Sequence, residues 1–227
     1  MPGVCAVLVA GGRGERLGVD RPKAFAKLGG RPLLAESLER LDASEWIDSV
    51  VVVAPPGWEE PSILLAEEVG AGKVSACVPG GAARTDSVRA GIAEVPDEAA
   101  VILVHDAARP LLPPEVVDRV LEPLGESWDG GVAALAVADT LKRGEDGAVV
   151  ETVDRTGLYA VQTPQAFVAK TFREALAAEG GEASDCAALV EAARGRIRLV
   201  EGDPRLLKVT TPADLALVES LLAATTR

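Results

Sequence analysis

Apolar runs and amphipathic segments alternate along most of the chain. Runs that predict strands lie at Val4–Val9, Ser49–Ala54, Lys73–Val78, Ala100–Val104, Gly131–Val137, Arg196–Val200 and Leu206–Thr210. Segments that predict helices lie at Pro32–Leu41, Glu59–Val69, Thr85–Glu94, Pro113–Leu124, Ala169–Ala178, Asp185–Ala193 and Pro212–Leu222. Apolar runs with almost no polar interruption are typical of strands buried on both faces. The alternation therefore predicts an α/β fold, a mostly parallel sheet with helices on both faces.

One segment, 138–163, breaks this order. It alternates polar and β-branched residues around the turn GEDG, Gly144–Gly147, which is typical of a polar, poorly buried hairpin. We expect this segment to project from the sheet as a β-arm. The chain shows no internal repeat or linker, so the sequence predicts a single domain, 1–227, that carries one arm.

The charge of the chain limits its partners. A formal net charge of −12 argues against a nucleic-acid binder or an anionic-membrane binder, because both partners require a basic surface. A small anionic substrate remains compatible with this charge if the few basic residues gather in a pocket. Such a cluster is present near the N-terminus, at Arg13, Arg16, Arg21 and Lys23.

Hydropathy and cysteine content point to the cytoplasm. No window approaches the roughly 20 apolar residues that a membrane span requires, and the first residues do not resemble a secretion signal. The three cysteines, Cys5, Cys77 and Cys186, lack the spacing of a metal site. We therefore expect a soluble cytoplasmic protein with buried, reduced thiols.

The stretch LVAGGRGERLGVDRPKAF, Leu8 to Phe25, follows the first predicted strand. It fails the dinucleotide pattern GxGxxG, since Leu17 stands at the third glycine, and it lacks the GK[ST] of a P-loop. What remains is a loop of small residues, 10–14, whose backbone N–H groups can surround phosphate oxygens, with Arg16 and Lys23 nearby. A tight turn with scattered basic residues is the alternative. The length of about twenty mostly irregular residues favours a binding loop.

Two further loops also follow predicted strands, so they reach the same edge of the sheet. In PGGAARTDSV, Gly81 can admit a base or ribose and Ser87 can offer a hydroxyl, although a turn with a helix cap is an equal interpretation. In VHDAARP, Asp106 can hold a divalent cation or a substrate hydroxyl and Arg109 can contact phosphate, unless the two form an ion pair that braces the loop. Lys208, between Leu207 and Val209, suggests a charge that points into a site.

The sequence offers phosphate-binding groups and few nucleophile-based arrangements. His105 is the only histidine, which leaves no credible Ser-His-Asp triad, and we interpret it as a structural group. No carboxylate pair suggests glycoside chemistry. Phosphoryl or nucleotidyl transfer, which depends on positioning and charge neutralisation, fits these residues best.

Six segments together carry a resemblance to one family. AGGRGERLGVDRPKAF, GGAARTDSV, VHDAARP, DTLKR, VDRTGLYAVQTPQAF and LKVTTPADLAL strongly resemble the 2-C-methyl-D-erythritol 4-phosphate cytidylyltransferases of the non-mevalonate isoprenoid pathway. The resemblance implies a Rossmann-like sheet of the nucleotide-diphospho-sugar transferase type. It also implies an enzyme that joins CTP and 2-C-methyl-D-erythritol 4-phosphate, with Mg²⁺ present, to give 4-diphosphocytidyl-2-C-methyl-D-erythritol and pyrophosphate. In this family the arm crosses to a second subunit, which implies a homodimer with shared active sites.

The resemblance assigns roles residue by residue. Catalytic charge stabilisation and positioning fall to Arg16, Lys23, Arg155 and Lys208. Contacts to CTP fall to Ala10, Gly11, Gly12, Gly14, Arg16, Lys23, Gly81, Ser87, Ala107 and Lys208. Contacts to the sugar phosphate fall to Asp106, Arg109, Thr140, Arg155 and Thr163, and Asp106 is also the candidate metal ligand. The attacking phosphate is already an anion, so no general base is required.

The chain departs from the family pattern at three places and leaves rivals open. Ala10-Gly11-Gly12 stands for the usual AAG, Leu158-Tyr159 for LW, and Ser184-Asp185-Cys186 for TDD or TDE. We therefore do not count the last element as a site. A pentitol-phosphate cytidylyltransferase, such as one for ribitol 5-phosphate, is the nearest rival, although such relatives usually show HDSVRP where this chain has HDAARP. A non-catalytic nucleotide-binding module is the second rival, and a hydride-transferring enzyme is disfavoured by the failed GxGxxG pattern.

Overall fold

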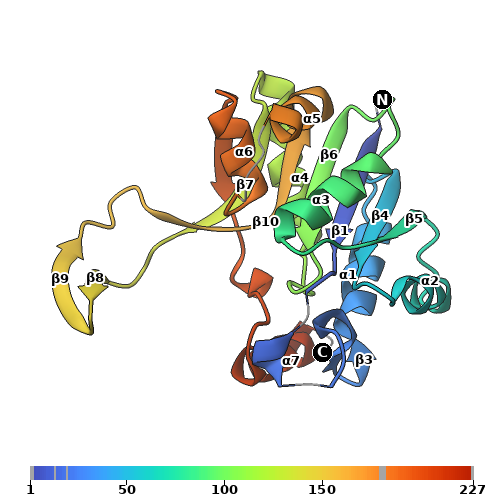
Figure 1. Ribbon diagram of the computed structural model, residues 1–227, viewed down its shortest axis with the longest axis horizontal. Coiled ribbons are helices and arrows are strands. Elements are labelled where there is room, and N and C mark those ends of the chain that lie inside the picture. The colour runs from blue at the N-terminus through green and yellow to red at the C-terminus, as the bar shows by residue number, and fades with distance from the viewer. Residues whose placement is uncertain (1–2, 13, 19, 179–182, 226–227) are drawn as a thin grey trace.

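A seven-stranded sheet forms the centre of the molecule (Figure 1). The computed structural model describes residues 3–12, 14–18, 20–178 and 183–225, so Arg13 lies outside the described residues. The strand order is β11-β7-β10-β6-β1-β4-β5. Its strands are β1 (Val4–Val9), β4 (Ser49–Ala54), β5 (Val74–Pro79), β6 (Val101–Asp106), β7 (Gly130–Ala136), β10 (Tyr159–Val168) and β11 (Ile197–Glu201). Strand β10 runs antiparallel to both neighbours and the other pairings are parallel, which confirms the predicted mostly parallel sheet.

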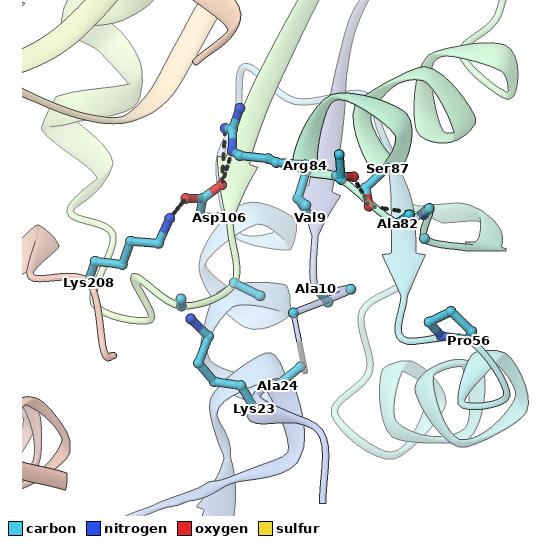
Figure 2. Close-up of a pocket in the computed structure, with 17 residues that line it drawn as sticks. Val9, Ala10, Lys23, Ala24, Pro56, Ala82, Arg84, Ser87, Asp106 and Lys208 are labelled. Atoms are coloured by element: carbon cyan, nitrogen blue, oxygen red, sulfur yellow. Dashed lines mark hydrogen bonds and ion pairs between the residues drawn. The ribbon is translucent and has the colours of Figure 1, made fainter. Parts of the chain in front are cut away.

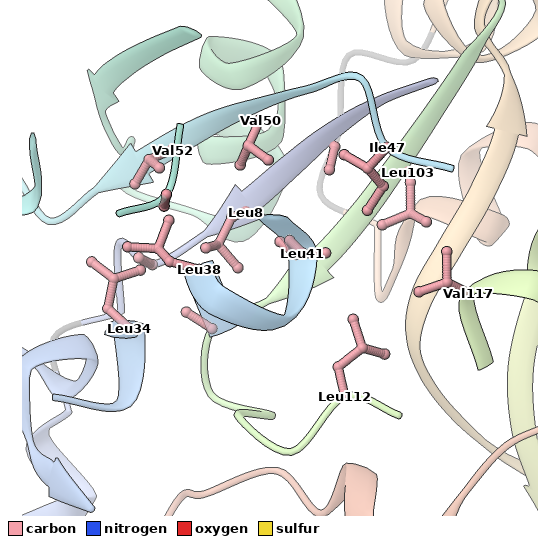
Figure 3. Close-up of a cluster of buried hydrophobic side chains, with 14 of the residues drawn as sticks. Leu8, Leu34, Leu38, Leu41, Ile47, Val50, Val52, Leu103, Leu112 and Val117 are labelled. Carbon is pink, nitrogen blue, oxygen red and sulfur yellow. The ribbon is translucent and has the colours of Figure 1, made fainter. Parts of the chain in front are cut away.

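Helices cover both faces of this sheet, as predicted. The helices are α1 (Leu33–Asp42), α2 (Glu59–Glu68), α3 (Arg84–Ala93), α4 (Pro114–Leu121), α5 (Ala169–Ala178), α6 (Cys186–Ala192) and α7 (Pro212–Thr225). Successive residues of β1 point to opposite faces, so Ala6 and Leu8 pack with α1, α2 and α4, whereas Cys5 and Val7 pack with α3, α5 and α6. Figure 3 shows the first of these clusters, in which Leu8 faces α1. In the described residues, no helix is both long and apolar enough to cross a membrane.

The predicted arm is a two-stranded hairpin that extends away from the sheet (Figure 1). It consists of β8 (Leu141–Glu145) and β9 (Ala148–Val153), which pair antiparallel. Asp146 and Gly147, both with positive φ of 49° and 80°, form the turn that GEDG predicted. The prediction was wrong about 159–163, because these residues belong to β10 of the central sheet, in which Tyr159–Val161 pair with β7.

The prediction of a strand at Leu206–Thr210 is also wrong. The chain there forms a short 3₁₀ helix, Pro204–Leu206, and continues to Thr210 without regular structure. The segment attaches to the loop after β6 instead of to a strand, since the Val209 N–H donates to the Ala108 carbonyl at 2.8 Å. Val209 is buried in a third apolar cluster with α7. Burial under a helix accounts for the apolar pattern that suggested a strand.

Candidate functional site

The described part of the chain contains a pocket of about 490 Å³ at the carboxyl edge of the parallel strands. Its lining is Val9, Ala10, Gly11, Gly12, Lys23, Ala24, Pro56, Gly80, Gly81, Ala82, Ala83, Arg84, Ser87, Asp106, Ala107, Ala108 and Lys208. Figure 2 shows how these residues converge from β1, β6, α3 and the segment before α7. In open α/β sheets this edge is where ligands bind. The structure thus brings together nine of the predicted site residues: Ala10, Gly11, Gly12, Lys23, Gly81, Ser87, Asp106, Ala107 and Lys208.

The glycine loop forms one wall of the pocket from small residues. A Cβ on Gly11 would lie 3.4 Å from Ser87 Oγ, so the backbone there already packs closely against the opposite loop. Gly14 does not line the pocket but has φ +77°, and a Cβ on it would lie 2.9 Å from the Lys23 Cβ. Gly14 is therefore needed for the turn that brings Lys23 back beside the loop.

Two lysines point toward the same part of the pocket from distant parts of the chain (Figure 2). Lys23 begins a 3₁₀ helix, Lys23–Phe25, and its pKa is lowered by burial and then by repulsion from Lys208. No salt bridge joins Lys23 to an acidic residue among the described residues, so this half-buried ammonium group is stabilised when an anion enters the pocket. The pocket is therefore prepared electrostatically for phosphate groups.

The loop after β5 forms the wall opposite the lysines. The Gly81 N–H donates to Ser87 Oγ at 3.1 Å, and the Ser87 hydroxyl donates to the Ala83 carbonyl at 3.2 Å. A Cβ on Gly81 would lie 2.3 Å from the Cβ of Asp86, so only glycine fits at this position. These bonds fix the loop and leave a narrow slot between it and the glycine loop.

Asp106 lies at the centre of the charged groups. Its Oδ1 accepts hydrogen bonds from Arg84 Nε at 3.2 Å and Arg84 Nη2 at 3.1 Å, and its Oδ2 accepts one from Lys208 Nζ at 2.7 Å. Burial raises the pKa of this carboxyl, but attraction to Arg84 and Lys208 outweighs burial and holds the pKa well below its usual range. The ion pair that the sequence suggested between Asp106 and Arg109 is not among the salt bridges of the described residues.

Arg109 and Thr163 are not part of the pocket lining. The Arg109 guanidinium donates to the Leu206 carbonyl, and its Nε is buried without a partner among the described residues. Thr163 Oγ1 accepts the Asp106 N–H at 3.0 Å and lies 3.2 Å from His105 Nδ1. His105 Nε2 lies 3.1 Å from the Arg109 carbonyl, which requires the neutral tautomer that carries its proton on Nε2. His105 is therefore structural, as predicted.

Three more of the predicted site residues are not in the pocket lining. Arg16 is exposed in a 3₁₀ helix, Glu15–Leu17. Thr140 precedes β8 and Arg155 follows β9, so both are exposed near the base of the arm hairpin, which extends away from the sheet (Figure 1). Arg16 nevertheless lies close enough to Lys23 for repulsion to contribute to the lowered pKa of Lys23, whereas Thr140 and Arg155 lie on the projecting arm.

Sequence reasoning missed Arg84. It stands inside the quoted segment GGAARTDSV, but the helix-start signal of Thr85, Asp86 and Ser87 drew the interpretation toward capping. A basic residue at a helix start is unusual, because the helix dipole favours negative charge there, and this was the available signal. The Arg84 guanidinium also donates to the Cys186 Sγ at 3.4 Å, so the element Ser184-Asp185-Cys186 contacts Arg84 through its last residue.

The pocket offers few protein ligands for a metal ion. Among the described residues there is no group of three or more His, Cys, Asp or Glu that could bind one. Asp106 is the single carboxylate in the pocket lining; its Oδ1 already accepts two hydrogen bonds from Arg84, whereas its Oδ2 accepts one from Lys208 and keeps a second lone pair. This arrangement fits Mg²⁺ bound mainly by substrate phosphates with one protein carboxylate.

Known proteins resemble this chain over nearly its whole length. The family model described as 2-C-methyl-D-erythritol 4-phosphate cytidylyltransferase matches residues 4–224. A protein of that name from Rhodococcus jostii (strain RHA1) is 45% identical over 221 residues, which cover 96% of this chain and 95% of that protein. The solved structure of a 4-diphosphocytidyl-2C-methyl-D-erythritol synthase has a TM-score of 0.83 and 35% identity, with coverage of 98% and 99%. The cytidylyltransferase of Thermus thermophilus has a TM-score of 0.79 and 37% identity, with coverage of 96% and 98%.

Proposed function

This chain belongs to the 2-C-methyl-D-erythritol 4-phosphate cytidylyltransferase family, and on that premise we propose how its residues perform the transfer. An oxygen of the substrate's 4-phosphate bonds to the α-phosphorus of CTP while the bond from that phosphorus to the pyrophosphate oxygen breaks. The products are 4-diphosphocytidyl-2-C-methyl-D-erythritol and pyrophosphate. The observation that carries the proposal is the convergence of Lys23 and Lys208 on one pocket with a backbone-lined wall.

CTP is proposed to occupy the slot between the two loops. The N–H groups of 10–14 surround the triphosphate, and Lys23 with Arg16 stabilises the charge that develops around the α-phosphorus. Arg16 lies on the same irregular loop as Lys23, and repulsion between them contributes to the lowered pKa of Lys23. Gly81, Ser87 and Ala107 line the remainder of the slot, where cytosine and ribose fit.

The sugar phosphate is proposed to bind beside Asp106 and Lys208. Asp106 accepts a hydroxyl of the polyol, and Lys208 attracts the attacking phosphate. The polar atoms of Thr163 and Arg109 are directed at Asp106, His105 and Leu206, which supports an indirect part for both in holding this floor. Since the attacking phosphate is an anion, positioning and electrostatics carry the rate.

Mg²⁺ is the proposed cofactor. When bound, it would neutralise charge on the triphosphate, with Asp106 as its ligand from the protein. The cytoplasm is the proposed location, which the three free thiols Cys5, Cys77 and Cys186 support.

A homodimer is proposed to complete the site, with Thr140 and Arg155 of the partner subunit entering each pocket. Two observations support it. The arm extends away from its own sheet, and its strand β9 exposes the apolar Val149 and Val150 by 66% and 55%. Apolar side chains exposed to this extent on a projecting hairpin are expected to be covered by another surface.

The test of function compares substrates with purified protein. Pyrophosphate release from CTP should be fast with 2-C-methyl-D-erythritol 4-phosphate and slow with ribitol 5-phosphate. Lys23→Met and Arg16→Ala should lower kcat by about 10²-fold or more with smaller effects on KM. Lys27→Met, at an exposed lysine outside the pocket lining, is the matched control and should keep wild-type kinetics. Faster use of ribitol 5-phosphate would select the pentitol rival, and no turnover of either would select the binding module.

The test of the dimer mixes two inactive variants. A heterodimer of Lys23→Met with Arg155→Ala contains one intact site, so random subunit exchange should restore about a quarter of wild-type activity. A mixture of Lys23→Met with Arg16→Ala, both on the same side of the site, should restore none. A monomeric mass in light scattering, or no recovery in the first mixture, would refute the shared site.

A further inference from the structure

Asp106 is fixed at three points. Its backbone N–H donates to Thr163 Oγ1 at 3.0 Å, its Oδ1 accepts two N–H groups of Arg84, and its Oδ2 accepts the Lys208 ammonium. The Asp106 side chain is 8% exposed and that of Arg84 is 25% exposed, so neither group moves freely into water. Two donors on one carboxylate oxygen fix the plane of the carboxylate and therefore the direction of Oδ2.

The position of the Lys208 ammonium group depends on the direction of Asp106 Oδ2, because the backbone around Lys208 is less regular than that around Arg84 or Asp106. Arg84 is the first residue of α3 and Asp106 the last residue of β6, so both have regular backbones. Lys208 lies in a segment without regular structure, and its side chain is 38% exposed. The contact with Asp106 Oδ2 is the salt bridge of Lys208 in the described residues. The placement of this ammonium group in the pocket thus follows from the carboxylate that holds it.

We propose that Arg84 is a positioning residue that acts through Asp106 to hold the Lys208 ammonium group where the sugar phosphate binds. Asp106 is the acidic partner of Arg84 in the salt bridges of the described residues. The other contact of the guanidinium, the Cys186 thiol, is buried, and burial raises its pKa to about 11, so it remains uncharged. Arg84 therefore directs its charge at Asp106. The kinetic consequence rests on the proposed function, whereas the arrangement of the three groups does not.

The kinetic test is a double-mutant cycle. Arg84→Ala should raise the KM for the sugar phosphate about tenfold while the KM for CTP changes by less than about threefold, and Arg84→Lys should recover part of the loss. In an Asp106→Asn background, Arg84→Ala should lower kcat/KM by no more than about a further twofold, because the carboxylate through which Arg84 acts on Lys208 is already absent. Arg89→Ala is the matched control, since Arg89 lies on the same helix but donates to the Leu176 carbonyl away from the pocket. Equal losses from Arg84→Ala in both backgrounds would overturn the proposal.

A second measurement needs no substrate. Removal of one member leaves a buried charge without its partner, so Arg84→Ala and Asp106→Asn should each lower the Tm, and the double variant should lose clearly less than the sum of both. Arg84→Gln replaces Arg84→Ala if the alanine variant does not fold. Additive losses of Tm would overturn the positioning role. Absent turnover by the wild-type protein would instead overturn the proposed function, so the two failures are distinguishable.

Discussion

Replacement of His105 by glutamine should remove a large part of the acid sensitivity of this protein between pH 7.5 and 5. His105 is fully buried, and burial lowers its pKa to about 4. In the unfolded chain the same imidazole titrates near its ordinary value of about 6.5. As the pH falls through 6.5, His105 therefore becomes protonated in the unfolded chain, whereas in the folded protein it stays neutral until about pH 4. The folded state loses stability throughout that interval.

The magnitude follows from the two pKa values. Each pH unit inside the interval costs about 1.4 kcal/mol, and the whole interval amounts to about 3 kcal/mol. Between pH 7.5 and 5 the loss is about 2 kcal/mol, because the proton uptake starts gradually around 6.5. His105 is the only histidine in the chain, and carboxyl groups of unfolded chains titrate mostly below pH 5. The change in the free energy of unfolding between pH 7.5 and 5 therefore reports mainly on His105.

Urea unfolding at a series of pH values, in buffer without magnesium, measures the effect. The free energy of unfolding of the wild-type protein should fall by about 2 kcal/mol from pH 7.5 to 5, whereas that of His105→Gln should stay nearly level. Glutamine is expected to keep a donor for the Arg109 carbonyl, so the variant should fold. Parallel curves for the two proteins would show that His105 does not titrate as a buried group, and the reasoning would fail.

Three further variants test the pocket and the core. Lys23→Met should raise the free energy of unfolding, because burial and Lys208 disfavour the Lys23 charge, while turnover is lost; a fall of more than about 1 kcal/mol in urea unfolding would contradict this. Gly81→Ala should raise the KM for CTP about tenfold, since its Cβ would lie 2.3 Å from Asp86, whereas Gly72→Ala, with open space around its Cβ, should leave that KM unchanged. Equal KM values for the two would refute the narrow slot. Phe167→Ala should cost about 3–5 kcal/mol of stability and keep the KM values, as Phe167 is fully buried against Phe172; a cost below about 1 kcal/mol would contradict the packing.

Patterns in the sequence predicted correctly those strands and turns that depend on residues close together in the chain. The strands Val4–Val9 and Ser49–Ala54 have the predicted bounds, because each is an apolar run that pairs with a strand on both sides and buries both faces. The turn of the arm was also predictable, since Asp146 and Gly147 suit positive φ. By contrast, the strand expected at Ala100–Val104 extends through His105 and Asp106. Those two polar residues pair with β1, and their buried side chains are satisfied by Thr163, Arg84 and Lys208 from other parts of the chain.

The candidate site likewise has parts that the sequence predicted and contacts that it did not. The sequence predicted that the glycine loop, Lys23, Asp106 and Lys208 would meet, and the pocket lining contains Ala10, Gly11 and Gly12 of that loop together with the three charged residues. It did not reveal Arg84 as the partner of Asp106, nor that Arg109 would turn to Leu206. The direction of a long side chain depends on neighbours from other elements, which no local pattern records.

The sequence by itself determined the alternation of elements, the arm and the phosphate-binding character of the loops, because these follow from hydrophobic period, turn residues and the chemistry of individual side chains. Only the tertiary structure decided that β10 enters the sheet antiparallel between β6 and β7, and that one carboxylate, Asp106, joins Arg84 to Lys208. Both depend on pairings between residues about twenty to one hundred positions apart, where the free energy of burial and charge pairing outweighs any local preference.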